Sequence, residues 1–260
     1  MNNPAHKNTS NSENEKGERI AKWLARAGVA SRREAETLIA DGKIAVNNQI
    51  VTHPATFIGS QDIVSLDGHV IDPPDRTRLW RYHKPVGLVT THKDPQGRKT
   101  VFESLPPMLP RVVSIGRLDL NSEGLLLLTN DGELARQLEL PGNHWTRRYR
   151  VRVFGTIRDD MLTSLKNGIT VEGVRYASID TRLDSQKGNN SWLTVSLQEG
   201  RNREIRRVMQ HIGLQVNRLI RIAYGPFQLG TLEKREVAEV PYKVIREQIV
   251  LSNTPNKKGG

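Results

Sequence analysis

The segment Asp72-Pro73-Pro74-Asp75 interrupts every regular pattern in this 260-residue sequence, and it limits what the chain can fold into. Proline fixes its own backbone and disfavours the helical conformation in the residue before it, so consecutive prolines end regular structure. We therefore predict a small domain over residues 18–71, a linker over residues 72–78 and a larger domain over residues 79–251.

The charge of the chain restricts its partners. Lys and Arg total 39 against 28 Asp and Glu, for a formal net charge of +11 and a pI near 10.1. This surplus favours a polyanion, and nucleic acid is the expected partner. The longest apolar run, Leu125-Leu126-Leu127-Leu128, is too short to cross a bilayer, so we expect no membrane association.

The two ends of the chain are polar. Residues 1–17 and 252–260 hold almost nothing that could be buried, which predicts disordered tails. Residues 1–17 also lack the apolar segment of a secretory signal, so we expect a cytoplasmic protein. We also expect a monomer. Because there is no cysteine and the seven histidines are scattered, we expect no metal. The sequence has no nucleotide-binding glycine loop either, and we expect no cofactor.

The small domain begins with two predicted helices and continues with strands. Apolar residues recur at helical spacing from Ile20, and Gly28 can close this first helix in a left-handed cap. Ser31 and Glu34 form the capping box of a second helix. Residues 44–51 alternate like a strand, and residues 63–71 contain the hairpin turn Asp67-Gly68.

Basic residues on the two predicted helices are candidate RNA contacts. Lys22 and Arg26 are four residues apart and share one helical face, and Arg32 and Arg33 begin the second helix. An ordinary solvated surface would give the same pattern. The segments Leu24-Ala25-Arg26-Ala27-Gly28 and Ser31-Arg32-Arg33-Glu34-Ala35-Glu36, however, resemble the αL RNA-binding module of the ribosomal-protein-S-four type. That resemblance implies that the module binds folded RNA.

Strands and helices mix without strict alternation in the larger domain. We predict strands at residues 79–82, 125–129, 149–154, 175–179 and 192–197, and helices at residues 130–138, 161–165 and 203–212. This order predicts an α+β domain with a mixed, largely antiparallel sheet and flanking helices. Residues 90–111, which include Arg98, form either an RNA-contacting arm or a plain surface loop.

Two polar motifs could carry chemistry. Asp119 lies between Gly116 and Gly124, where the backbone can turn sharply and present a carboxylate in a cleft, although an Asp in a turn is often only a hydrogen-bonding loop residue. The second motif places four arginines within seven residues: Arg201, Arg203, Arg206 and Arg207. Guanidinium groups stay charged when desolvated, so this cluster suits RNA phosphates or an active-site Asp, and it could also be a solvated helix face.

Together, the two motifs resemble a known family. Gly116-Arg117-Leu118-Asp119, with Ser122 and residues 124–129, resembles the signature of the RsuA-type pseudouridine synthases, and residues 200–208 resemble their later basic motif. The resemblance covers about residues 18–247. The sequences of residues 93–98 and 202–207 are similar to those of the RluB branch of this family, which modifies large-subunit ribosomal RNA.

The resemblance implies a role for each matching residue. Asp119 would be the catalytic nucleophile and Arg206 the basic partner that keeps its carboxylate ionised. Tyr149 would stack on the flipped-out uridine, and Leu219 would form a pocket wall, although a sheet-packing tyrosine and a core leucine would look the same. Arg117, Arg201, Arg203 and Arg207 would contact RNA. A non-catalytic ribosome-assembly factor is the main alternative, and a DNA-binding regulator is a weaker one.

Overall fold

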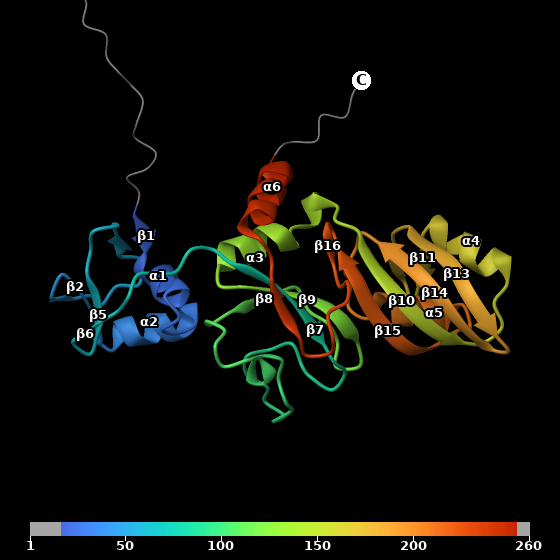
Figure 1. The fold of residues 1–260 in the computed structure, drawn as a ribbon, viewed down its shortest axis with the longest axis horizontal. Coiled ribbons are helices and arrows are strands. Elements are labelled where there is room, and N and C mark those ends of the chain that lie inside the picture. Colours follow the sequence, from blue (N-terminus) through green and yellow to red (C-terminus); the bar gives the residue numbers. More distant parts are fainter. Residues whose placement is uncertain (1–16, 254–260) are drawn as a thin grey trace, which may run out of the picture. The chain divides into compact units, whose positions relative to one another are not determined.

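The protein is described by a computed structural model that covers residues 17–253, and the chain forms two compact units (Figure 1). The boundary lies between Arg76 and Thr77, inside the segment that the sequence predicts as a linker. The predicted tails at residues 1–16 and 254–260 lie outside the described residues. Within residues 17–253, no helix is long and apolar enough to span a membrane.

The first unit packs two helices against a small sheet. Helices α1 (Ile20–Arg26) and α2 (Arg32–Ala40) bury apolar residues in a common core with the strands. The predicted capping box is confirmed: the backbone N–H of Glu34 donates to Ser31 Oγ at 3.2 Å, and the backbone N–H of Ser31 donates to Glu34 Oε2 at 2.9 Å. A two-residue strand β1 (Glu18–Arg19) pairs with β4 (Phe57–Ile58).

The sheet of this unit corrects one prediction. Residues 44–51 are not one strand but a hairpin of β2 (Ile44–Val46) and β3 (Gln49–Ile50), because Asn47 and Asn48 adopt φ values of 50° and 66°. Asparagine tolerates this left-handed conformation and forms tight hairpin turns. The second hairpin, of β5 (Val64–Leu66) and β6 (His69–Val70), turns at Asp67-Gly68 as predicted.

The second unit is built on a nine-stranded sheet with the order β13-β14-β10-β15-β9-β7-β17, to which β16 and β8 are attached. Its strands are β7 (Leu79–Lys84), β8 (Val113–Ile115), β9 (Glu123–Thr129), β10 (Arg147–Phe154), β13 (Ile179–Lys187), β14 (Asn190–Leu197), β15 (Gln215–Tyr224), β16 (Phe227–Gln228) and β17 (Val237–Glu239). Strands β15 and β9 are parallel, and the other pairs are antiparallel. The predicted α+β class with a mixed, largely antiparallel sheet is confirmed.

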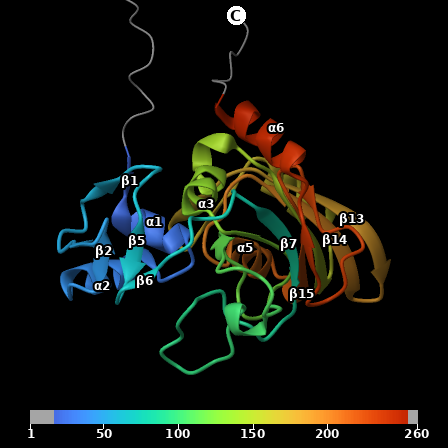
Figure 2. The ribbon, with the colours of Figure 1, turned by 60° about the vertical axis from the view of Figure 1, so that its left-hand side comes forward.

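Both faces of the central strand β9 are covered. Leu125 and Leu127 pack against helices α3 (Gly132–Glu139) and α6 (Tyr242–Asn253), which lie close together in Figures 1 and 2. Leu126 and Leu128 pack on the other face against residues of the 88–112 segment. A strand that is buried on both faces needs apolar side chains at every position, which explains the run of four leucines.

The other half of the sheet has a separate core on one face. Alternate residues of β10 and β14, including Val151, Val153, Leu193 and Val195, form this core with helix α5 (Glu204–His211). Helix α4 (Asp159–Lys166) and the hairpin of β11 (Ile169–Val171) and β12 (Val174–Tyr176) add Leu165, Val171 and Tyr176 to it. The opposite face carries Arg150, Arg152, Trp192 and Thr194.

Several predicted element ends are wrong. The N-cap of α3 is Asp131, whose side chain accepts hydrogen bonds from Glu133 and Leu134, whereas Asn130 Oδ1 accepts a bond from the backbone of Arg78. Arg203 precedes α5 in a left-handed conformation instead of opening the helix. The strand predicted at residues 175–179 is divided between β12 and β13. Helix α6 extends to Asn253, beyond the predicted domain end at residue 251.

Candidate active site

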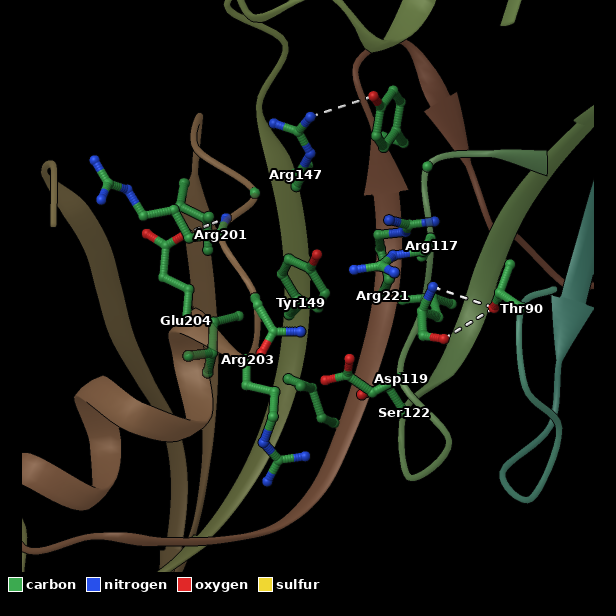
Figure 3. A pocket seen from close by; sticks show the side chains of 18 of the residues that line it. Thr90, Arg117, Asp119, Ser122, Arg147, Tyr149, Arg201, Arg203, Glu204 and Arg221 are labelled. Atoms are coloured by element: carbon green, nitrogen blue, oxygen red, sulfur yellow. Dashed lines mark hydrogen bonds between the residues drawn. The ribbon is translucent and has the colours of Figure 1, made fainter. Parts of the chain in front are cut away.

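A cavity of about 490 Å³ opens on the face of the sheet that carries Tyr149, at the junction of β9 and β15 (Figure 3). Six residues that the sequence predicts as functional line it: Arg117, Asp119, Tyr149, Arg201, Arg203 and Leu219. Figure 3 shows the Asp119 carboxylate directed into the space between its own loop and Tyr149. The cavity therefore combines the carboxyl groups of Asp119, Glu139 and Glu204 with two tyrosine rings, Tyr149 and Tyr224, and several cations.

The loop that carries Asp119 is fixed through its backbone by a buried lysine. Lys84 is fully buried, and its ammonium donates to the carbonyls of Pro85 at 3.0 Å, Asp119 at 3.1 Å and Ser122 at 2.9 Å. Burial lowers the pKa of Lys84 to about 8, while the carboxylates of Asp119 and Glu123 act in the opposite direction. Lys84 thus has a structural role, because its hydrogen bonds hold the backbone of the loop in place.

Two further contacts hold the same loop. Thr90 Oγ1 donates to the carbonyl of Leu118 at 2.9 Å. The backbone N–H of Gly87 donates to the carbonyl of Leu120 at 2.8 Å. The carbonyls on both sides of Asp119 are therefore engaged, which limits the conformations that its backbone can adopt and pre-organises the carboxylate.

Gly124 has to be a glycine because of a close backbone contact. It has a φ of +105°, and a Cβ atom at this position would lie 2.3 Å from the carbonyl oxygen of Arg221. Gly124 and Arg221 are paired across the parallel junction of β9 and β15. This contact sets where β9 starts, and with it the position of the preceding loop.

Arg206 contacts the Asp119 loop, but not in the predicted way. Its guanidinium donates to the carbonyls of Asn121 at 2.7 Å and Val216 at 3.1 Å. Among the described ion pairs within 4.0 Å, none joins Arg206 to Asp119, and Arg206 does not line the cavity. Burial and the charge of Arg203 lower the pKa of Arg206, and the Asp119 carboxylate counteracts them, so the two groups interact electrostatically without a direct ion pair.

Tyr149 and Leu219 form part of the cavity wall. Tyr149, on β10, is half-buried and also packs against the apolar clusters on its face of the sheet. Leu219, on β15, is 6% exposed and belongs to the same core. Both residues therefore contact the cavity and the core, so their predicted substrate roles and their packing roles are compatible.

The arginine cluster divides into three groups. Arg201 and Arg203 are exposed and line the cavity, as does Arg117 from the opposite wall. Arg206 bonds the backbone of the Asp119 loop, and Arg207 is exposed outside the cavity. The cluster is thus neither one phosphate site nor one solvated helix face.

The remaining predicted RNA contacts lie elsewhere. Lys22 and Arg26, in the first unit, both form ion pairs with Glu18, at 3.1 Å and 2.9 Å. Arg98 lies outside the cavity and pairs with Asp94 at 2.7 Å. Arg32 and Arg33 are exposed on α2. Their roles in RNA binding stay predictions.

The 90–111 segment is not an exposed arm throughout. Val101 is fully buried, and Phe102, Leu105 and Leu109 pack into the same apolar cluster. Residues 92–99 remain largely exposed. The high content of Pro, Gly and basic residues predicts an exposed segment. The buried residues were not predicted because their spacing follows neither the helix nor the strand period.

Sequence reasoning missed Arg221 as a site residue. Arg221 lines the cavity although it is 2% exposed. Its Nε donates to the carbonyl of Leu125 at 2.7 Å, and its Nη2 has no hydrogen-bond partner among the described residues. A buried guanidinium nitrogen beside a cavity favours an anionic or carbonyl-bearing ligand.

Glu204 was also missed, because it lies inside a strongly basic motif. It lines the cavity, is 4% exposed, and its Oε2 accepts the backbone N–H of Arg201 at 3.0 Å. Burial raises the pKa of Glu204 to about 7, partly opposed by that hydrogen bond. Besides Asp119, the cavity therefore contains a buried carboxyl group whose pKa lies near neutral pH.

Comparisons with known proteins identify the family of this chain. Residues 78–211 match the family model of RNA pseudouridylate synthase, and residues 18–64 match that of the S4 domain. An uncharacterized RNA pseudouridine synthase of Rickettsia bellii is 52% identical over 229 residues, which cover 88% of this chain and 99% of the relative. Ribosomal large subunit pseudouridine synthase B of Haemophilus influenzae is 41% identical over 254 residues, which cover 93% of this chain and 71% of the relative.

A solved structure shares the fold. The crystal structure of a pseudouridylate synthase aligns with a TM-score of 0.61 at 23% identity, and the match covers 88% of this chain and 99% of that one. The family model and the sequence relatives confirm the family predicted from the two motifs. This chain belongs to the RNA pseudouridylate synthase family, whose members are isomerases, and it carries an S4 domain as its first unit.

Proposed function

We propose that this protein converts a uridine of large-subunit ribosomal RNA to pseudouridine, with Asp119 as the nucleophile. The observation that carries this proposal is the Asp119 carboxylate, which faces a cavity on a loop whose neighbouring carbonyls are clamped. The relatives named ribosomal large subunit pseudouridine synthase B support the choice of RNA.

The chemistry suits these residues. The reaction breaks the bond between uracil N1 and the ribose, turns the base, and joins its C5 to the same ribose carbon, so no group is gained and no net electron transfer occurs. A carboxylate can form a covalent intermediate that separates the two steps. The buried guanidinium of Arg221 lines the cavity and suits a uracil carbonyl.

The target base has to leave its stack before it can react. Tyr149 offers an aromatic face in the cavity wall, and Leu219 adds an apolar one. Arg117, Arg201 and Arg203 surround the opening and suit the phosphates that flank an extruded nucleotide.

The test uses Asp119→Asn, which keeps the size and shape of the side chain. Wild-type protein should form pseudouridine in a large-subunit ribosomal RNA transcript without any added cofactor, as mapped by carbodiimide modification. Asp119→Asn should form none, while its affinity for the transcript stays within about threefold. Modification by the variant would refute the role of Asp119. Tight binding without modification by the wild type would instead favour the ribosome-assembly factor.

A further inference from the structure

The half of the sheet formed by β13, β14, β10 and β15 has a second face, opposite the cavity. On β10, Tyr149, Val151 and Val153 point toward the core on the cavity side, so Arg150 and Arg152 point to the reverse face. Phe154 shares this face and is 44% exposed. The reverse face is thus open to solvent at these positions.

Basic and aromatic side chains lie directly opposite one another across these four strands. Arg152 is the cross-strand partner of Arg218 on β15 and of Trp192 on β14, and Trp192 in turn pairs with Ser185 on β13. Directly opposed side chains on one face are close neighbours. The next row of partners is Phe154, Asn190 and Lys187.

The ring of Trp192 is the centre of this face. The guanidinium carbons of Arg150 and Arg218 lie 5.1 Å and 6.0 Å from its ring centroid. A hollow of about 560 Å³ adjoins the ring and is lined also by Arg152, Lys187 and Asn190. Stacked planar groups beside a hollow form a surface on which a further planar ring can lie.

The acidic residues of this face do not neutralise it. Asp184 forms ion pairs with Arg150 at 3.3 Å and with Arg182 at 3.2 Å. Glu123 forms ion pairs with Arg218 and Lys234, so each of these two carboxylates is shared by two cations. Arg152 and Lys187 enter no ion pair within 4.0 Å among residues 17–253, and both are exposed. The hollow therefore keeps an excess of positive charge, which is complementary to a phosphate backbone.

We propose that this reverse face, centred on Trp192, binds a single-stranded segment of RNA at a site separate from the active-site cavity. Arg152 and Lys187 contact the phosphates, and the bases stack on the exposed aromatic and guanidinium groups. A four-stranded sheet with aromatic residues and flanking cations is a physically suitable platform for unpaired bases, because every base has a face that can stack. That the ligand is RNA rests on the proposed function.

The position of this face implies that it takes a different stretch of RNA from the cavity. Arg152 lies three residues beyond Tyr149 on β10, which is about 10 Å along the strand, and its side chain points the opposite way. A nucleotide in the cavity cannot reach it. The face would therefore hold RNA that flanks the modified site.

The test uses a fluorescein-labelled 20-nucleotide oligoadenylate, which contains no uridine, so its binding does not depend on catalysis. We compare Arg152→Glu/Lys187→Glu with Arg158→Glu/Lys166→Glu, which makes the same charge change at the two ends of helix α4. Fluorescence anisotropy at several salt concentrations gives the Kd and its salt dependence. Arg152→Gln/Lys187→Gln is a milder variant, and circular dichroism checks that each variant is folded.

The reverse-face glutamate variant should bind at least tenfold more weakly, and its slope of log Kd against log salt should fall by about 1.4, which corresponds to two lost phosphate contacts. The glutamine variant should lie between it and the wild type, and the α4 control should change less than twofold. Equal effects of both glutamate variants, or unchanged binding in both reverse-face variants, would overturn the proposal. So would a 20-residue polyglutamate that displaces the RNA at a similar concentration, since the face would then suit an acidic protein.

Discussion

The guanidinium of Arg206 donates a hydrogen bond of 2.7 Å to the carbonyl of Asn121, two residues beyond Asp119 in the same loop. The planar, forked guanidinium also donates a second bond, at 3.1 Å, to the carbonyl of Val216 on β15. Arg206 thus connects the loop to the neighbouring strand, and its influence on Asp119 combines charge with position.

Arg206→Lys tests this double role. Lysine keeps the positive charge but cannot reproduce two diverging bonds from one planar group, so the loop should lose its alignment. We expect kcat to fall about 10- to 100-fold with KM changed less than about threefold, measured with a large-subunit ribosomal RNA transcript. Arg136→Lys, at an exposed position of α3 outside the cavity, should retain nearly full activity. If Arg206→Lys were as active as the wild type, the positive charge of residue 206 alone would account for its role, and its two hydrogen bonds would not be needed.

Gly124→Ala should destabilise the second unit strongly. The new Cβ would lie 2.3 Å from the carbonyl oxygen of Arg221, and the φ of +105° is unfavourable for alanine. We expect the free energy of unfolding, measured in urea, to fall by about 3 kcal/mol or more. Gly116→Ala is the matched control: its φ is +68° and no atom lies within 4 Å of the added Cβ, so only backbone strain of about 1 kcal/mol is expected. Similar losses would exclude the close contact as the cause.

Glu204→Gln should change how stability depends on pH. Burial raises the pKa of Glu204 from 4.5 to about 7, so the folded protein holds this proton more tightly than the unfolded chain. The protonated Glu204 side chain makes its full contribution to the free energy of unfolding below pH 4.5. This contribution, on the order of 3 kcal/mol, is lost as the pH rises through 7. The variant should therefore lose less stability than the wild type between pH 5 and pH 8 in urea unfolding. Glu233→Gln, at an exposed position, should behave like the wild type.

Local patterns predicted the parts of the fold that depend on local interactions. The capping box of Ser31 and Glu34 joins residues three apart, and the turn at Asp67-Gly68 is specified by its own two residues. The run from Leu125 to Leu128 predicted a strand. The Asn47-Asn48 turn was missed, although three consecutive polar residues, Asn47 to Gln49, interrupt the apolar residues there.

The candidate site was predictable only in part, because its contacts join distant segments. Asp119, Tyr149 and Leu219, which the family resemblance rather than their spacing assigned to one site, line the same cavity. The bond from Arg206 to Asn121, however, spans 85 residues and depends on how β15 lies beside β9. For the same reason, no local signal distinguishes the buried Glu204 and Arg221 from the exposed charges around them.

The parallel pairing of Gly124 with Arg221 also determines which leucine reaches which core. Side chains alternate along a strand, so a slip of one residue would send Leu125 to the side now occupied by Leu126. The backbone contact that aligns the Asp119 loop is therefore the one that directs apolar residues to two separate cores. A substitution that shifts this register would move the Asp119 loop and would also exchange the two faces of the strand behind it.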